Sequence, residues 1–164
     1  LEAATDKLTG LPNRRLLESQ LASLIERSTP FVLVLADLDN FKRVNTERGH
    51  RAGDAVICAI ADALCEIARD DDCIARIGGD EFAAVLPGVG VEAARVFAER
   101  LIDAIAATPE AQRSGVTASA GFALSPLHGD TLEKLVFTAD TALMAVKASG
   151  KDGGSSVARI VSAL

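Results

Sequence analysis

Two separate stretches of the sequence end in pairs of carboxylates with the chemistry of a metal-binding or acid–base site. Asp37 and Asp39 close the apolar run FVLVLADLD, and Asp80 and Glu81 follow a Gly-Gly pair in RIGGDEF. Ionised groups at the end of a buried run are costly unless they reach water, a charged partner or a metal ion. Oxygen ligands from separate segments, with room for phosphate and water, are what Mg²⁺ requires. The spacing alone leaves two interpretations open: a metal site, or solvated strand ends.

The elements around these acids predict how they come together. The apolar run Phe31–Asp39 has the pattern of a strand with both faces buried. Side chains alternate along a strand, so Asp37 and Asp39 share one face. The stretch CIARIGGDEFAAVLP (residues 73–87) predicts a hairpin, because glycine accepts the positive φ of a tight turn. Sequential elements usually pair, so we expect this hairpin beside the first strand, with Asp80 near Asp37.

The rest of the chain predicts helices that alternate with strands. Helices are expected over residues 13–28, 40–48, 52–68, 91–107 and 130–148, and strands over residues 116–124 and 157–164. Asn40 is expected to cap the second helix. Strands interleaved with helices, plus one hairpin, predict the α/β (α+β) class, with a mixed central sheet flanked by helices. Without an internal repeat or a long linker, residues 1–164 are expected to form a single domain.

Composition narrows the possible partners. The chain has 164 residues, of which 49% are hydrophobic and 24% charged, the balance of a globular domain. Its net charge of −6 argues against binding nucleic acid, which needs clustered Lys and Arg. No apolar run reaches the length that spans a bilayer, so this segment is expected to make no direct membrane contact. The three cysteines form no CxxC pair, which favours a cytoplasmic location, alone or as the cytoplasmic part of a membrane-attached protein.

Several other nucleotide and hydrolase signatures do not occur in the sequence. It contains no GxxxxGK[ST] phosphate-binding loop and no GxSxG nucleophile elbow. The stretch GVGVEA (residues 88–93) matches GxGxxA, but no acid ends a following strand as a dinucleotide-binding fold expects. His50 and His128 are isolated and fit no zinc pattern. The carboxylates are therefore the leading candidate site.

Five blocks of sequence together resemble the GGDEF family of diguanylate cyclases. They are DKLTGLPNRR (residues 6–15), DLDNFKRVN (37–45), GHRAGD (49–54), RIGGDEF (76–82) and ADTALMAVKASGK (139–151). The resemblance implies a palm-like fold similar to that of class III nucleotide cyclases, with the GGDEF turn on the hairpin. It also implies a reaction that joins two GTP into cyclic di-GMP and releases two pyrophosphates, in a homodimer with two-fold symmetry.

The resemblance gives the acids specific roles. It implies that Asp37, the carbonyl of Leu38 and Asp80 are ligands of Mg²⁺ or Mn²⁺. Glu81 would lie beside the metal ions as a ligand or a proton acceptor, so the implied catalytic residues are Asp37, Asp80 and Glu81. The Gly78–Gly79 pair would let the backbone approach the substrate phosphates, where a Cβ would intrude.

Guanine recognition is implied for Asn45 and Asp54. An aspartate accepts hydrogen bonds from the N1–H and N2–H₂ edge of guanine, and adenine offers no such pair of donors. From the residues alone, Asn45 is also explained as a residue at a helix C-terminus, and Asp54 as a helix N-cap. Phe41 belongs to the same implied substrate-binding set.

The implied phosphate-binding residues include departures from the family pattern. Lys42 and Lys147 are implied to bind terminal phosphates, and Lys151 stands where the family usually has Arg. A lysine keeps the charge but loses the bidentate fork that suits phosphate. Departures from the common family residue also occur at Thr46, Met144, Val146 and Asp152. They leave open a weakly active or non-catalytic module that binds GTP or cyclic di-GMP as a sensor. An enzyme that also accepts ATP is a third possibility, against which Asp54 argues.

A second, inhibitory site for the product is implied upstream of the hairpin. Arg69 and Asp72 form an RxxD motif at the family's spacing before the glycines, and Arg100 stands where the family often has a second inhibitory arginine. Arginine can bind the O6 and N7 atoms of guanine. The alternative is a solvated acidic turn that ends a helix. Because the chain begins with Leu rather than Met, we expect it to be the C-terminal part of a longer signalling protein.

Overall fold

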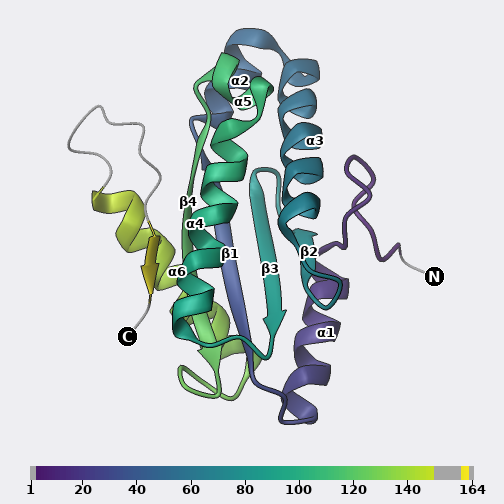
Figure 1. The fold of residues 1–164 in the computed structure, drawn as a ribbon. Coiled ribbons are helices and arrows are strands. Elements are labelled where there is room, and N and C mark those ends of the chain that lie inside the picture. Colours follow the sequence, from purple (N-terminus) through teal and green to yellow (C-terminus); the bar gives the residue numbers. More distant parts are fainter. Residues whose placement is uncertain (1–2, 150–159, 163–164) are drawn as a thin grey trace.

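A five-stranded sheet forms the centre of the computed structural model, which describes residues 3–149 and 160–162. Its strands are β1 (Phe31–Asp39), β2 (Cys73–Arg76), β3 (Glu81–Pro87), β4 (Thr117–Ser125) and β5 (Ile160–Ser162). They lie in the order β2-β3-β1-β4-β5 (Figure 1). β3 pairs antiparallel with both β2 and β1, and β1 pairs antiparallel with β4. β5 runs parallel to β4. The predicted mixed sheet is confirmed.

Helices cover both faces of this sheet. On one face lie α1 (Arg14–Glu26) and α6 (Leu132–Ser149), and on the other lie α3 (His50–Ile67) and α4 (Val91–Ala107). The shorter helices α2 (Phe41–Arg48) and α5 (Pro109–Ser114) lie near one end of the sheet (Figure 1). The predicted class, a mixed sheet flanked by helices, is therefore confirmed as well.

The sequence of β1 explains why both faces are covered. Its odd-numbered residues, such as Leu33 and Leu35, belong to the core beneath α1 and α6. Its even-numbered residues, such as Val32 and Val34, belong to the core beneath α3 and α4. All four side chains are at most 7% exposed, and burying a side chain of this size contributes about 1.5–3 kcal/mol. The same alternation places Asp37 at the end of the face that α1 and α6 cover.

The predicted hairpin is confirmed, but the reason given for its glycines is wrong. β2 pairs with β3, with Arg76 opposite Phe82, and β3 also pairs with β1 as expected. Among the described residues, however, the glycines with positive φ do not include Gly78 or Gly79. At this turn Gly78 therefore provides space rather than an unusual backbone conformation.

The ends of two helices differ from the expectation. α3 begins at His50 rather than near residue 52, because Gly49, with φ of 84°, ends α2 and starts α3 directly. Asn40 precedes α2 but its side chain makes no capping hydrogen bond. The backbone of Asn40 is left-handed, with φ of 67°, and the side-chain Nδ2 of Asn40 donates to the carbonyl of Gly115 at 3.5 Å. The predicted capping role of Asn40 is wrong.

One short helix was not predicted, although its sequence carries a signal. α5 begins after Thr108, whose hydroxyl oxygen accepts from the N–H of Ala111, and Pro109 occupies the first helical position. At the other end of the chain, β5 falls within the strand expected over residues 157–164. The glycine-rich stretch of residues 150–156 lies outside the described residues. None of the described helices is both long enough and apolar enough to cross a membrane.

Candidate active site

The two carboxylate pairs meet at one end of the sheet. In the register between β1 and β3, Asp37 lies opposite Glu81. One residue further along β1, the N–H of Leu38 donates to the carbonyl of Asp80 at 3.0 Å. These pairings tie the Gly-Gly turn to the end of β1. The convergence expected from the sequence therefore occurs, and it arises from the strand register.

Lys147, in the last turn of α6, lies against Asp37. Its Nζ is 3.0 Å from Asp37 Oδ2 and 3.3 Å from Asp39 Oδ1. Burial raises the pKa of the Asp37 carboxyl, and the negative charges of Asp80 and Glu81 raise it further. The hydrogen bond and charge of Lys147 lower that pKa, but they do not outweigh these effects. Burial acts to lower the pKa of Lys147, but the hydrogen bonds and charges of the two aspartates outweigh it and raise that pKa. Lys147 is therefore a fixed positive charge among acids.

The donor set at this point fits a hard divalent cation. Asp37 Oδ1 is buried and accepts no hydrogen bond from the described residues, so one carboxylate oxygen remains available to a cation. The neighbouring groups offer oxygen, which Mg²⁺ prefers. Within residues 3–149 and 160–162, no three Asp, Glu, His or Cys side chains are gathered into a metal-binding group. Mg²⁺ commonly takes one or two carboxylates and completes its shell with substrate phosphates and water, so the arrangement suits it.

Space for the Glu81 side chain depends on Gly78. A Cβ on Gly78 would lie 2.6 Å from Glu81 Oε2, whereas a Cβ on Gly79 would meet nothing within 4 Å. Glu81 is also 3.7 Å from the Arg14 guanidinium at the start of α1, with both side chains about half exposed. The two glycines are therefore not equivalent: of this pair, only Gly78 leaves room for the Glu81 side chain.

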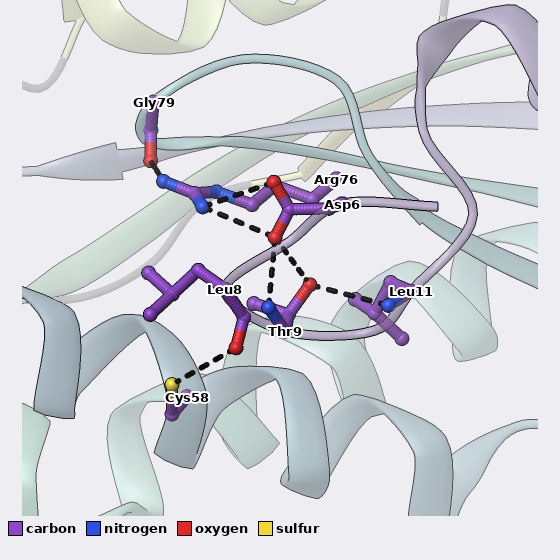
Figure 2. Close-up of polar contacts among 7 residues, drawn as sticks. All are labelled: Asp6, Leu8, Thr9, Leu11, Cys58, Arg76 and Gly79. Atoms are coloured by element: carbon purple, nitrogen blue, oxygen red, sulfur yellow. Dashed lines mark hydrogen bonds and ion pairs between the residues drawn. The ribbon is translucent and has the colours of Figure 1, made fainter. Parts of the chain in front are cut away.

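A network of polar contacts that was not predicted from the sequence connects the Gly-Gly turn to the N-terminal segment (Figure 2). Arg76 Nη1 lies 3.2 Å from both carboxylate oxygens of Asp6, and Arg76 Nη2 donates to the carbonyl of Gly79 at 2.8 Å. The Asp6 carboxylate also accepts from the N–H and the hydroxyl of Thr9. Cys58 on α3 donates to the carbonyl of Leu8 at 3.7 Å, which connects the same N-terminal turn to α3. Asp6 and Arg76 both lie in sequence blocks that carried the family resemblance. Their opposite charges were the feature of the sequence from which this ion pair could have been predicted.

The residues implied in guanine binding lie together on α2 and α3. A Cβ on Gly53 would lie 1.9 Å from Asn45 Oδ1, so the Asn45 side chain rests directly on Gly53, next to Asp54. Asp54 is exposed inside α3 and is not its N-cap, which is Gly49. Phe41 is buried beside them at 8% exposure. The N-cap explanation of Asp54 is therefore wrong, and its carboxylate is free to meet a ligand from solvent.

The remaining phosphate-binding candidates are partly described. Lys42 is exposed on α2, and Lys147 lies among the acids, whereas Lys151 and Asp152 lie outside the described residues. In the sequence, Asp39 was noted as part of the carboxylate pair that ends β1, without a ligand role of its own. In the structure it accepts hydrogen bonds from Ser119 and Thr117 of β4 as well as from Lys147.

The three residues of the implied inhibitory site line one surface pocket of about 530 Å³, together with Val89 and Phe97. Arg69 donates through its backbone N–H and its guanidinium to Asp72, whose side chain is 1% exposed. Arg100 comes to the pocket from α4. Asp72 therefore orients Arg69, and the pocket brings together two arginines that are far apart in the sequence.

Known proteins of similar sequence give a consistent result. The family model described as "Diguanylate cyclase, GGDEF domain" matches residues 3–153. Diguanylate cyclase DgcP of Pseudomonas aeruginosa is 41% identical over 159 residues, which cover 92% of this chain and 23% of that protein. Response regulator PleD of Caulobacter vibrioides is 37% identical over 159 residues, which cover 92% of this chain and 35% of that protein. The chain thus spans well under half the length of these two relatives.

Solved structures agree with this likeness. A sensory box/GGDEF family protein from Caulobacter crescentus matches with a TM-score of 0.81 and 37% identity, covering 90% of this chain and 100% of that one. The GGDEF domain of DgcB from Caulobacter crescentus, solved in complex with c-di-GMP, matches with a TM-score of 0.78 and 28% identity, covering 99% and 97%. This chain therefore belongs to the family of diguanylate cyclase GGDEF domains.

Proposed function

We propose that this domain condenses two GTP molecules into cyclic di-GMP. The 3′-oxygen of one GTP bonds to the α-phosphorus of the other, the bond from that phosphorus to the β-phosphate oxygen breaks, and pyrophosphate leaves. The same step in the opposite direction closes the ring and releases the second pyrophosphate. The observation that carries the proposal is the meeting of Asp37, Asp80, Glu81 and Lys147 at one end of the sheet, in a chain of this family.

A divalent cation, Mg²⁺ or Mn²⁺, would be held by Asp37, the carbonyl of Leu38 and Asp80. When bound, it lowers the pKa of the attacking hydroxyl and neutralises charge on the phosphates. The free, buried Oδ1 of Asp37 supports this assignment. Glu81 would accept the proton of the attacking hydroxyl or complete the coordination, and Lys147 would hold terminal phosphates.

The substrate would lie across the loop between β1 and α2. Asn45 and Asp54 would bind the guanine edge, with Phe41 supporting Asn45 from the core. Lys42 would contact phosphate from α2, and Lys151 would do so from the segment that follows α6. The open space at Gly79 would allow the backbone to approach a phosphate closely. Asp54 is the residue that would favour GTP over ATP.

Catalysis would require two copies of the domain. One domain presents a single set of guanine and metal candidates, whereas the reaction joins two nucleotides. A homodimer with two-fold symmetry would place two sites face to face, each supplying one GTP.

Product feedback would act through the pocket that Arg69, Asp72 and Arg100 line. Cyclic di-GMP carries two guanines and two phosphates, and arginine binds both kinds of group through paired N–H donors. The pairing of Arg69 with the buried Asp72 supports this role, because it orients the guanidinium before a ligand arrives. The exposed position of Arg100 leaves its charge accessible.

The proposal is tested by incubating the domain with GTP and Mg²⁺ and detecting cyclic di-GMP by mass. Asp80→Asn should abolish the product. Asp103→Asn, at an exposed position of α4, which covers the opposite face of the sheet from α6, is the matched control and should retain turnover. A concentrated dimer that binds GTP and never forms product would contradict the proposal. That result would support the alternative, a module that binds GTP or cyclic di-GMP as a sensor.

The cellular setting follows from family and composition alone. We propose that residues 1–164 form one GGDEF domain within a longer signalling protein, since the relatives are several times longer. A cytoplasmic location and the absence of nucleic-acid partners stay predictions from the cysteine pattern and the acidic charge.

A further inference from the structure

Asp39 is held in place by two hydroxyl groups of the neighbouring strand. In the register between β1 and β4, Asp39 lies opposite Thr117, and Ser119 is two residues further along β4. The Ser119 hydroxyl lies 3.0 Å from Asp39 Oδ2 and 3.2 Å from Oδ1, and the Thr117 hydroxyl donates to Oδ2 at 3.2 Å. Ser119 is only 6% exposed, so its hydroxyl has little access to water as an alternative partner. The Asp39 carboxylate is therefore fixed before any ligand binds.

This fixed carboxylate in turn holds Lys147. Asp39 Oδ1 accepts from Lys147 Nζ at 3.3 Å, while Asp37 Oδ2 lies 3.0 Å from the same nitrogen. The two aspartates differ in their surroundings. Asp37 has an oxygen free for a cation, whereas Asp39 accepts from Lys147 at Oδ1 and from Thr117 at Oδ2, with the single Ser119 hydroxyl proton shared between the two oxygens. A cation that draws on Asp37 would weaken its attraction for Lys147. Asp39 would keep its own attraction, because no part of the proposed metal site uses it.

We propose that Asp39, supported by Ser119 and Thr117, is a positioning residue that keeps the Lys147 ammonium at the edge of the metal site, where a polyphosphate chain would bind. This inference rests on the proposed function, because it takes Lys147 as a phosphate contact. Lysine has a long, flexible side chain, and an ammonium that is already in position loses less conformational entropy when it binds phosphate. Asp39 acts through Lys147 and does not itself touch the nucleotide.

Binding of two guanine nucleotides separates this role from a merely structural one. 3′-Deoxy-GTP keeps the triphosphate but lacks the attacking hydroxyl, so it binds without reacting, and GMP lacks the terminal phosphates. Asp39→Asn keeps the shape of the side chain and removes its charge. By calorimetry with Mg²⁺ present, Asp39→Asn should weaken binding of 3′-deoxy-GTP about 10-fold or more and leave GMP binding within about 2-fold. Ser119→Ala, which keeps the Asp39 charge, should weaken binding of 3′-deoxy-GTP by a smaller factor and should also leave GMP binding nearly unchanged.

A double-mutant cycle tests whether the effect passes through Lys147. Lys147→Met should itself lower the preference for the triphosphate, and adding Asp39→Asn should then change that preference no further. Asp103→Asn, at an exposed site on α4, is the charge-matched control and should bind both nucleotides like the wild type. Thermal unfolding of each variant identifies any that fails to fold, and Ser119→Ala then carries the test.

Each outcome has a distinct meaning. If Asp39→Asn and Ser119→Ala bind 3′-deoxy-GTP as tightly as the wild type, or lose GMP to the same extent, Asp39 has no positioning role. Additive effects of Asp39→Asn and Lys147→Met would overturn the inference in the same way. If the wild-type domain binds neither nucleotide, the proposed function itself fails, and the inference fails with it.

Discussion

The ion pair between Asp6 and Arg76 should stabilise the fold far more than its surface counterparts. The perturbation is Asp6→Asn, which keeps the size of the side chain and removes its charge. The change removes the ion pair with Arg76, which also holds the Gly79 carbonyl, and leaves Thr9 a weaker, neutral acceptor. We expect the variant to fold with a lower melting temperature.

The size of the effect follows from burial. The side chains of Asp6 and Arg76 are 22% and 15% exposed, so water screens their attraction less than at the surface. Burial acts to raise the pKa of Asp6, but the hydrogen bonds from Thr9 and the charge of Arg76 outweigh it and lower that pKa. A depressed carboxyl pKa contributes stability that is present at neutral pH and is lost only as the pH falls through the folded-state pKa. Hydrogen bonds to a charged group contribute about 1.5–3 kcal/mol, which corresponds to a loss of about 4–8 °C in a domain of this size.

Thermal unfolding at pH 7 measures this loss against a matched control. Asp130→Asn removes the ion pair with Lys134 on α6, where the two side chains are 74% and 63% exposed, and should lower the melting temperature much less, because water screens the pair. In the double variant Asp6→Asn/Arg76→Met, the loss of unfolding free energy should differ from the sum of the two single losses by about 1 kcal/mol or more. A shift for Asp6→Asn no larger than that for Asp130→Asn would refute the reasoning.

Three further predictions follow from local geometry. Gly78→Ala should displace Glu81, because the new Cβ lies 2.6 Å from its Oε2; cyclic di-GMP formation should fall about 10-fold or more, and an equal loss for Gly79→Ala would contradict this explanation. Arg69→Ala should raise the product concentration needed for inhibition about 10-fold and preserve the initial rate; an unchanged inhibition curve would mean that the pocket does not bind product. His128 accepts a hydrogen bond from the Leu124 N–H at Nδ1, and burial lowers its pKa. Its neutral ring therefore contributes stability that is present above the ordinary pKa of about 6.5 and is lost as the pH falls below it. In His128→Asn, the asparagine Oδ1 replaces Nδ1 as acceptor. When the pH is lowered from 7.5 to 5, the melting temperature of this variant should fall less than that of the wild type. An equally steep fall would count against the mechanism.

Local patterns predicted most of the fold. The continuous apolar run of β1 requires cover on two faces, and α1 and α6 on one side and α3 and α4 on the other provide it. The Gly-Gly signal located the hairpin, although Gly78 and Gly79 do not adopt positive φ. Helix ends were less certain because capping depends on the conformation of one residue. Asn40 has the right side chain for a cap, but its left-handed backbone turns that side chain toward Gly115.

The candidate site was predicted in part because strand order brings its acids together. With β3 paired to β1 in the observed register, Asp37 lies opposite Glu81. The place of Lys147 could not be derived in this way. It lies 108 residues from Asp39 in the sequence, and only the packing of α6 on the sheet brings the two together. The same holds for Arg69 and Arg100, which share a pocket because α4 lies next to the turn after α3.

By itself, the sequence indicated the family through the resemblance of its five motif blocks. It also determined the central strand and the pairing of two acidic strand ends, because apolar periodicity and turn residues act over short distances along the chain. Only the tertiary structure decided which charges are neighbours. Asp6 meets Arg76 across 70 residues, and Asp39 meets Lys147 from a different strand and helix. Such contacts depend on how helices pack against a sheet, and that packing is set by the whole buried core rather than by any one segment.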